Sequence, residues 1–384
     1  MELGKSIENQ NNVVVRLAKK VIDTMSNGSN VVFSPMSINV LLSLIAAGSN
    51  SVTKEEILSF LMSPSTDYLN AVLAKMTDGG TERSDLCLST ANGVWIDKSV
   101  SLQSSFKELL EKSYKATYSQ VDFEAKPVEV IDEVNTWADK HTNGLIKQIL
   151  SRESIDTIEE IRCSSLILAN AIYFKAAWSR KFDPNLTKDN DFHLLDGKTV
   201  KVPFMTDYKK QYLRDYDGFQ VLRLPYVEDK RQFSMYIYLP SDKDGLAALL
   251  EKIGSEPGFL DSHIPLHRTS VDAFRIPKFK FAFEFKASDV LIDMGLTSPF
   301  SSEGNSTEMV DSSALSVSSI IHKACIEVDE EGTEAAAVSV AIMVPQCLMR
   351  NPDFVADHPF LFTVREDKSG VILFMGQVLD PSKH

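Results

Sequence analysis

Cysteine, histidine and long apolar runs are all scarce in this 384-residue chain, and each shortage argues against a class of protein. Its four cysteines, Cys87, Cys163, Cys325 and Cys347, are widely spaced, with no CxxC pair and no cluster at metal-ligand spacing. We therefore expect neither a disulfide framework nor a metal site. No apolar run approaches about 18 residues, so no membrane-spanning segment is expected. The first ten residues lack the apolar core of a signal peptide, which favours the cytoplasm and leaves unconventional export open.

Basic residues are outnumbered as well. The chain carries 40 Lys and Arg against 53 Asp and Glu, a formal net charge of −13. A protein with this charge repels the phosphates of nucleic acids and anionic lipids. Neither a nucleic acid nor a membrane is therefore an expected partner.

Signatures of common enzymes are also missing. The chain has no GxSxG nucleophile elbow, no HExxH and no GxGxxG after a strand. Gly197-Lys198-Thr199 resembles the end of a phosphate-binding loop, but the position that requires glycine holds Phe192. We expect no enzyme, no catalytic residue and no cofactor. An unrelated enzyme stays an alternative, because catalytic triads assemble in space rather than in sequence.

No linker, repeat or low-complexity tract divides the chain, so we expect one domain over residues 1–384. Helical periodicity marks the first half, and the predicted helices include 13–25, 37–48, 104–115 and 127–142. Ser37 is the expected N-cap of the second helix, and Thr53-Lys54-Glu55-Glu56 resembles the capped start of a third. Strand patterns follow at 166–174, 233–239 and 279–285. The first is almost wholly apolar, as in a strand buried on both faces, and the last alternates. Helices followed by strands predict an α+β fold with large antiparallel sheets.

The segment after Gly332 has an unusual distribution of side-chain sizes. From Thr333 to Ala341, every second residue is small, and the residues between them are mostly β-branched. Small side chains can enter a packed sheet without a large cavity, and β-branched residues favour extended backbone. Gly332 offers a hinge, while Pro345 and Pro352 prevent regular pairing beyond the run. A plain buried strand followed by a turn would also fit this composition.

This segment also carries a family resemblance. It resembles the proximal hinge of the inhibitory members of the serpin superfamily at Glu330, Gly332, Thr333, Glu334, Ala335, Ala336 and Ala337. Further serpin-like motifs lie in the expected order along the whole chain, at Phe33–Ile38, Asn170–Trp178, Pro277–Phe279, His322, Asp357–Phe362 and Leu373–Val378. The run Phe354–Pro359 and the missing signal peptide resemble plant serpins of the serpin-Z type.

The resemblance implies the serpin fold, an α+β arrangement of about nine helices packed on three mostly antiparallel β-sheets. It also implies an exposed reactive-centre loop at residues 332–357. Six polar or aromatic residues match family positions that hold the main sheet shut or line the point of loop entry: Ser34, Ser37, Asn170, Trp178, Lys278 and His322. Each also has an ordinary explanation, because buried polar residues need hydrogen-bond partners anyway and Lys278 with Glu330 could form a simple surface pair.

The implied function is suicide inhibition of serine, or cysteine, endopeptidases. The loop would be cleaved, the acyl-enzyme trapped and the cut loop inserted into the main sheet. We expect a monomer that forms a covalent 1:1 complex with its target protease. The alternative is a non-inhibitory serpin that acts in binding or storage.

Family spacing places the cleaved bond fourteen residues after Gly332, between Gln346 and Cys347. A trypsin-like protease would prefer the bond between Arg350 and Asn351, which is the second candidate. Cys347 would be a redox-sensitive thiol on an exposed loop, or merely an unreactive small side chain.

Overall fold

The computed structural model describes residues 2–26, 28–49, 51–77, 86–142, 144, 146–228, 230–301, 308–310, 315–331 and 351–383. These residues form ten α-helices: α1 (Glu2–Met25), α2 (Pro35–Ala47), α3 (Ser51–Phe60), α4 (Thr66–Thr77), α5 (Ser104–Lys112), α6 (Pro127–His141), α7 (Ile155–Arg162), α8 (Leu246–Ser255), α9 (Phe259–Ser262) and α10 (Ala287–Asp293). Two short 3-10 helices are η1 (Pro184–Leu186) and η2 (Ser298–Phe300). Among the described residues, no helix has both the length and the apolar character needed to cross a bilayer.

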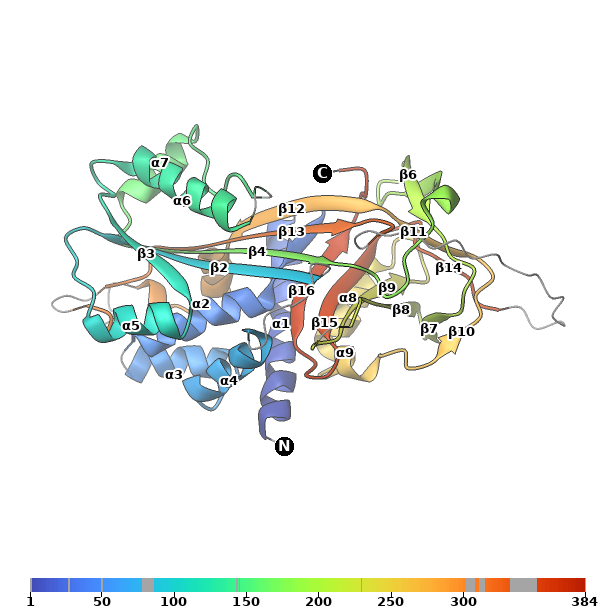
Figure 1. The fold of residues 1–384 in the computed structure, drawn as a ribbon, viewed down its shortest axis with the longest axis horizontal. Helices are drawn as coiled ribbons and strands as arrows, with labels where there is room; N and C mark the ends of the chain where they lie inside the picture. The colour runs from blue at the N-terminus through green and yellow to red at the C-terminus, as the bar shows by residue number, and fades with distance from the viewer. Residues whose placement is uncertain are drawn as a thin grey trace.

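Three sheets carry the fold (Figure 1). The five-stranded sheet has the order β12 (Phe279–Lys286), β13 (Ser319–Val328), β4 (Leu166–Ala176), β2 (Leu86–Asp97) and β3 (Ala116–Val121). The seven-stranded sheet has the order β1 (Val31–Phe33), β16 (Ile372–Val378), β15 (Phe360–Glu366), β9 (Phe233–Pro240), β8 (Phe219–Pro225), β7 (Gln211–Tyr216) and β10 (Arg268–Thr269). The four-stranded sheet has the order β14 (Phe354–Val355), β11 (Phe274–Pro277), β6 (Thr199–Met205) and β5 (Lys188–His193). The α+β prediction with three sheets is confirmed.

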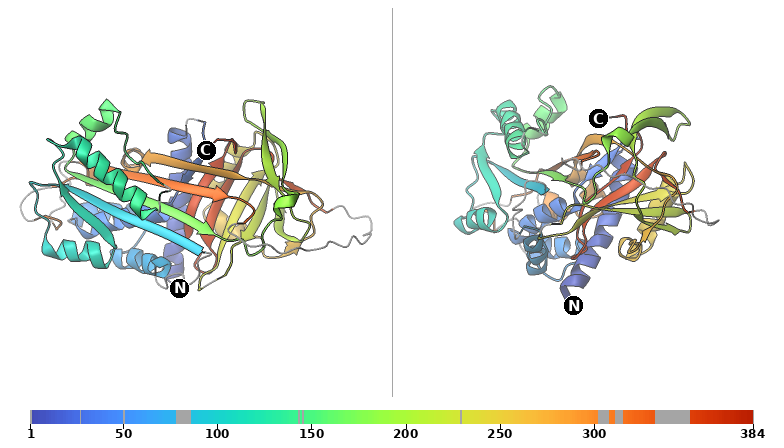
Figure 2. Two further views of the ribbon diagram at one scale, coloured as in Figure 1. Left: turned by 45° about the horizontal axis from the view of Figure 1, so that its top comes forward. Right: turned by 45° about the vertical axis from the view of Figure 1, so that its right-hand side comes forward.

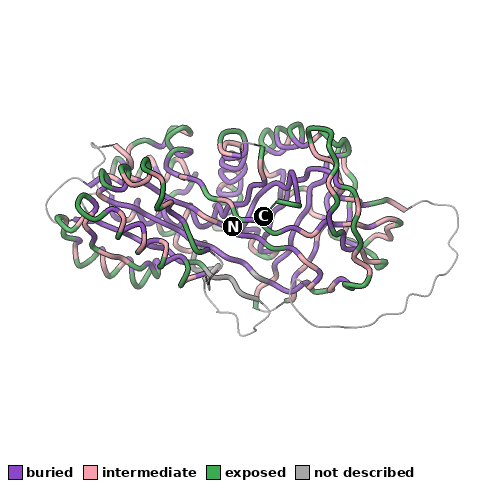
Figure 3. Tube along the Cα trace, turned by 90° about the horizontal axis from the view of Figure 1, so that it is seen from above, coloured by how far each residue is buried: buried purple, intermediate pink, exposed green. Residues whose placement is uncertain are grey.

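Strand β4 is buried on both faces, as its apolar run predicts. Leu166 and Leu168 pack into the core that contains α1 and α2, whereas Ile167 and Ala169 pack into the core under α6. In Figure 2, α6 lies across one face of the five-stranded sheet. Figure 3 shows the buried strands running through the middle of the molecule, with exposed helical turns outside. The sheet is therefore enclosed between two layers of packed side chains.

Strand β12 alternates as predicted, with Phe279 and Phe281 buried and Lys280 exposed. Two predicted helix starts are wrong. The N-cap of α2 is Ser34, whose Oγ accepts a hydrogen bond from the Ser37 N–H at 3.2 Å, so Ser37 lies inside the helix. Pro35 follows the cap because its fixed φ and missing N–H suit the first turn. Helix α3 begins at Ser51, so Thr53 lies within it.

Gly376 lets β16 lie closely between β1 and β15. A Cβ atom at this position would stand 2.0 Å from the Val31 carbonyl oxygen and 2.7 Å from the Phe362 ring. The Val31 oxygen belongs to the backbone of the neighbouring strand, so it cannot move aside without breaking the ladder.

We therefore expect Gly376→Ala to lower the unfolding free energy by about 1–3 kcal/mol or more, as overpacking does. The matched control is Gly254→Ala in α8, where a new Cβ meets only the flexible Lys19 side chain at 3.4 Å. Thermal denaturation of both variants provides the measurement. A Gly376→Ala protein with the same melting temperature as the wild type would contradict this account of the close approach.

Candidate functional site

The candidate site is the seam between β4 and β13 in the five-stranded sheet. These two strands pair in parallel, from Ser319 opposite Ile167 to Cys325 opposite Tyr173. The pairing stops there, although β13 continues to Val328 and β4 to Ala176. Of the six residues predicted to hold or line the main sheet, Asn170 and His322 lie in this seam, and Trp178 and Lys278 contact the residues that follow β13. Ser34 and Ser37 lie at the start of α2.

Asn170 and His322 are register partners across the seam. Both are buried, and the Ser34 N–H at the start of α2 donates a hydrogen bond to His322 Nε2 at 2.9 Å. The structure thus brings together Ser34, Asn170 and His322, which come from three distant parts of the chain. Ser37 lies one helical turn into α2, and its hydroxyl has no partner among the described residues.

The bond from Ser34 determines the tautomer of His322. Because Nε2 accepts a hydrogen bond from the Ser34 N–H, the neutral ring carries its own proton on Nδ1. This Nδ1–H finds no acceptor, and the Asn170 side-chain oxygen finds no donor, within the described part of the chain. Each unsatisfied buried group costs about 1–3 kcal/mol of desolvation. The seam is therefore closed but not optimally bonded.

Asn170 is tied instead to the next strand. Its amide donates to the Ala91 carbonyl at 3.2 Å and to Asn92 Oδ1 at 2.9 Å, both on β2. The Asn92 amide in turn donates to the Tyr114 carbonyl at 3.1 Å. Asn92 was missed in the sequence, although a polar residue within the otherwise apolar run Ala91–Trp95 was a usable signal.

Residues 329–331 continue from β13 and are held beyond the paired part of the seam. The Trp178 indole N–H donates to the Asp329 carbonyl at 2.8 Å, and the Trp178 backbone N–H donates to the Glu331 carbonyl at 3.3 Å. The Phe182 N–H donates to the Glu330 carbonyl at 3.0 Å. Trp178 also stacks on Tyr226, with 4.5 Å between ring centroids.

Glu330 is the best-anchored residue of this segment. One carboxylate oxygen lies 2.6 Å from Lys278 Nζ, and the other accepts from the Thr187 hydroxyl at 2.7 Å. Burial by itself raises the pKa of Glu330, but the hydrogen bonds from Lys278 and Thr187 outweigh it and hold the pKa below its ordinary value. Glu330 is therefore ionised at neutral pH. No feature of the sequence pointed to Thr187.

The other predicted site residues fall outside the described residues, namely Gly332, Thr333, Glu334, Ala335, Ala336, Ala337, Gln346, Cys347 and Arg350. Asn351 is described: its N–H and its amide group bond to the Asp272 carboxylate at 3.1 and 2.8 Å. The segment that follows residue 350 is thus anchored at its first residue.

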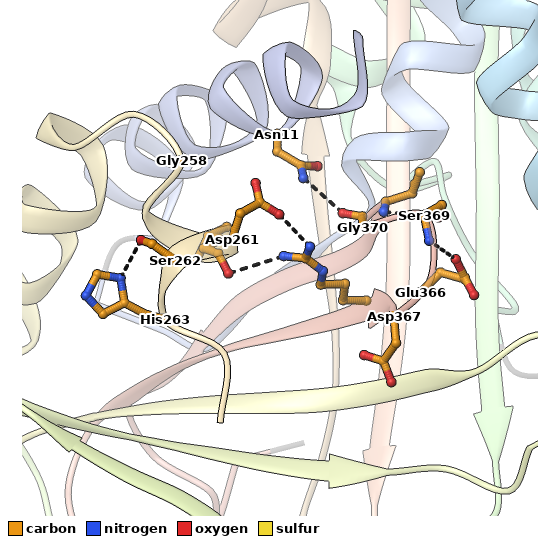
Figure 4. Close-up of polar contacts among 12 residues, drawn as sticks. Asn11, Gly258, Asp261, Ser262, His263, Glu366, Asp367, Ser369 and Gly370 are labelled. Atoms are coloured by element: carbon orange, nitrogen blue, oxygen red, sulfur yellow. Dashed lines mark hydrogen bonds and ion pairs between the residues drawn. The ribbon is translucent and has the colours of Figure 1, made fainter. Parts of the chain in front are cut away.

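A second polar cluster lies at the turn between β15 and β16 (Figure 4). The Asn11 amide donates to the Gly370 carbonyl at 2.9 Å, and Arg365 forms an ion pair with Asp261 of α9. These contacts fasten α1 and α9 to the seven-stranded sheet, so we interpret the cluster as structural. No cluster of histidine, cysteine or acidic residues suited to a metal ion occurs in the described ranges.

Comparison with known proteins gives a consistent result. The family model described as "Serpin (serine protease inhibitor)" matches residues 8–381. Serpin-Z3 and Serpin-Z10 of Arabidopsis thaliana are 85% and 77% identical, with 100% of both chains covered in each case. The solved structure of Arabidopsis AtSerpin1, titled as its native stressed conformation, has a TM-score of 0.91 at 55% identity and covers 100% of both chains. Human thyroxine-binding globulin, at 23% identity over 100% of both chains and a TM-score of 0.84, shares the fold alone.

The buried His322 leads to a prediction about pH. Burial lowers the pKa of His322 to about 3, well below the ordinary value of about 6.5 that it regains on unfolding. Only the unfolded chain binds the proton between these two values, so stability is complete above pH 6.5 and falls as the pH drops. From pH 6.5 to 5 the loss is about 2 kcal/mol, at roughly 1.4 kcal/mol per pH unit.

Guanidinium unfolding at pH 7 and pH 5 measures this loss. In His322→Gln, the part of the pH dependence due to this ring should vanish, while the control His267→Gln, at an exposed position, should keep the wild-type slope. Equal slopes in the wild type and His322→Gln would show that the ring is not the titrating group.

Proposed function

This chain belongs to the serpin family, and we propose that it is a suicide inhibitor of serine endopeptidases, with cysteine endopeptidases as a second target class. Membership supports protease inhibition in general. The observation that carries the finer proposal is the parallel seam between β4 and β13, with residues 329–331 held at its unpaired end.

The direction of the strands supports insertion at this seam. The chain leaves β13 at Val328, so a segment that folds back beside β13 runs antiparallel to it. Because β4 is parallel to β13, the same segment is antiparallel to β4 too. The parallel pairing of β4 with β13 would be replaced by two antiparallel strand pairings, which are slightly more stable per residue. Strand addition of this kind can drive a large conformational change.

The surroundings of the seam explain the small residues after Gly332. The seam strands are packed from both faces, since Ile320 of β13 contributes to the core of α1 and α2 and Ile321 to the core under α6. A strand that enters between β13 and β4 must fit its side chains into these layers. Thr333, Ala335 and Ala337 are small enough to do so with little rearrangement.

In the proposed mechanism, the nucleophile of the protease attacks the carbonyl carbon of Gln346. The Gln346–Cys347 peptide bond breaks, Cys347 leaves with a free amine, and Gln346 stays esterified or thioesterified to the protease. The freed segment then inserts into the seam and carries the protease with it, as a covalent 1:1 complex. Inhibition requires insertion to be faster than hydrolysis of the acyl-enzyme.

The anchoring of Asn351 supports the Gln346–Cys347 bond over the Arg350–Asn351 bond. The Asn351 N–H would belong to the cleaved bond in the second case, and it is bonded to Asp272 at 3.1 Å. The Asn351 side chain is bonded to the same carboxylate. A protease would have to break both contacts before this bond could enter its active site.

The remaining predictions belong to the same proposal. Residues 1–384 form one serpin domain with the reactive-centre loop at 332–357, and the protein acts as a monomer. The contacts of Trp178 and Lys278 with residues 329–331 hold the segment that leads into the loop until cleavage. The cytoplasmic location stays a prediction.

Denaturing gels with a panel of serine and cysteine proteases test the proposal. We expect an adduct of the protein with at least one protease that survives boiling in detergent. Mass spectrometry of the released C-terminal fragment should give Cys347 as its first residue. Complete cleavage with no adduct, across the panel, would exclude inhibition and favour the alternative of a serpin acting in binding or storage. A fragment beginning at Asn351 would assign the second candidate bond.

The variant Ala337→Arg tests insertion itself. A large charged side chain on the small face cannot enter the packed seam, so hydrolysis should win and the protein should become a substrate. The control Ala337→Ser keeps the side chain small and should remain an inhibitor. Both are compared by the number of inhibitor molecules consumed for each protease inactivated. Unchanged stoichiometry in Ala337→Arg would refute insertion at this seam.

A further inference from the structure

The four-stranded sheet carries a polar cavity of about 180 Å³, away from the seam between β4 and β13. Its walls include Asn190 and His193 of β5, Arg275 of β11, and Asp357, which follows β14. One water molecule needs only about 10–15 Å³, whereas sites for drug-sized ligands begin at about 300 Å³. The cavity therefore suits a small polar molecule.

Arg275 supplies the positive charge of the cavity. Its half-buried guanidinium donates from Nη1 to Asn190 Oδ1 at 3.0 Å. It forms no ion pair with any described residue, so most of its five N–H donors stay available. A guanidinium with free donors is a bidentate site for a carboxylate.

Asp357 supplies a negative charge on another wall. One carboxylate oxygen accepts from His358 Nδ1 at 2.8 Å. The other oxygen lies 3.7 Å from His193 Nε2, too far for a hydrogen bond, and accepts none from the rest of the described chain. Burial raises the pKa of Asp357, but the hydrogen bond from His358 and the nearby positive charges hold it below its usual value. The free oxygen thus belongs to an ionised carboxylate.

The balance of charge selects the ligand. A simple anion would meet Asp357 and Asp191, and Asp191 is only loosely paired, with Lys201 at 3.9 Å. A simple cation would meet Arg275. We propose that the cavity binds a small zwitterion, an α-amino acid, with its carboxylate on Arg275 and its ammonium group on Asp357.

Binding would also clamp a short strand. β14 has only two residues, and its segment is attached to β11 through the Phe354 N–H to the Ala273 carbonyl at 2.7 Å and the Ala356 N–H to the Arg275 carbonyl at 3.0 Å. A zwitterion that bridges Arg275 and Asp357 adds a further link between β11 and this segment. The occupied cavity therefore resists detachment of residues 354–357, whether or not the protein inhibits proteases.

Isothermal titration of the full chain with glycine, L-alanine and L-serine tests the site, with acetate and ethylamine as probes of a single charge. We expect at least one of the amino acids to bind saturably at concentrations up to about 10 mM. Neither acetate nor ethylamine should bind in this range. Arg275→Gln and Asp357→Asn should each weaken binding by about tenfold or more, because each removes a charge-assisted bond. Arg152→Gln, at an exposed position, is the matched control and should bind as the wild type does.

Hydrogen exchange at the Phe354 and Ala356 amides tests the clamp and should slow several-fold with the amino acid bound. No saturable binding, equal binding of acetate, or full binding by Arg275→Gln would each overturn the site. Unchanged exchange in the bound protein would overturn the clamp. If Arg275→Gln does not fold, Arg275→Lys replaces it as the test variant, because lysine keeps the charge without the bidentate geometry. Amino-acid binding at wild-type strength in Arg275→Lys would overturn the bidentate contact.

Discussion

The parallel contact between β4 and β13 is the constraint on which the rest of this structure depends. It joins β4, the central strand of the five-stranded sheet, to its neighbour β13 for only part of their length and ends at Cys325 and Tyr173. Within it lie a donor on His322 and an acceptor on Asn170 that find no partner among the described residues. The backbone ladder and the packing around it close this part of the seam, and these two side-chain groups add no bond of their own across it.

Polar contacts from outside the two strands hold the seam at two places. At the middle of the paired part, the Ser34 N–H at the start of α2 bonds to His322, so the first turn of a helix is fastened to β13. Beyond the end of the paired part, Trp178, Lys278 and Thr187 hold residues 329–331. The proposed inhibition uses this arrangement, because residues held at an unpaired end are the ones that a folding-back strand would move first. The bond between Asn351 and Asp272 fixes the start of the segment that follows residue 350.

Most of the secondary structure could be predicted from local pattern. The both-face burial of β4 and the alternation of β12 follow from which residues are apolar, and the structure confirms them. The errors at α2 and α3 were errors of boundary. Ser34 and Ser37 are equally good capping residues by type, but Pro35 suits the first helical position, so the sequence did hold a signal for Ser34 as the cap.

The sequence by itself determined the family, the α+β class and the small-sided run after Gly332, because each is written in local composition and ordered motifs. Tertiary structure alone decided that His322 pairs with Asn170, that Thr187 bonds Glu330, and that Arg275 and Asp357 line one cavity. These contacts join segments far apart in the chain. Their register is set by the layers that pack against each sheet, and no periodicity within a single segment encodes which distant strand will lie beside it.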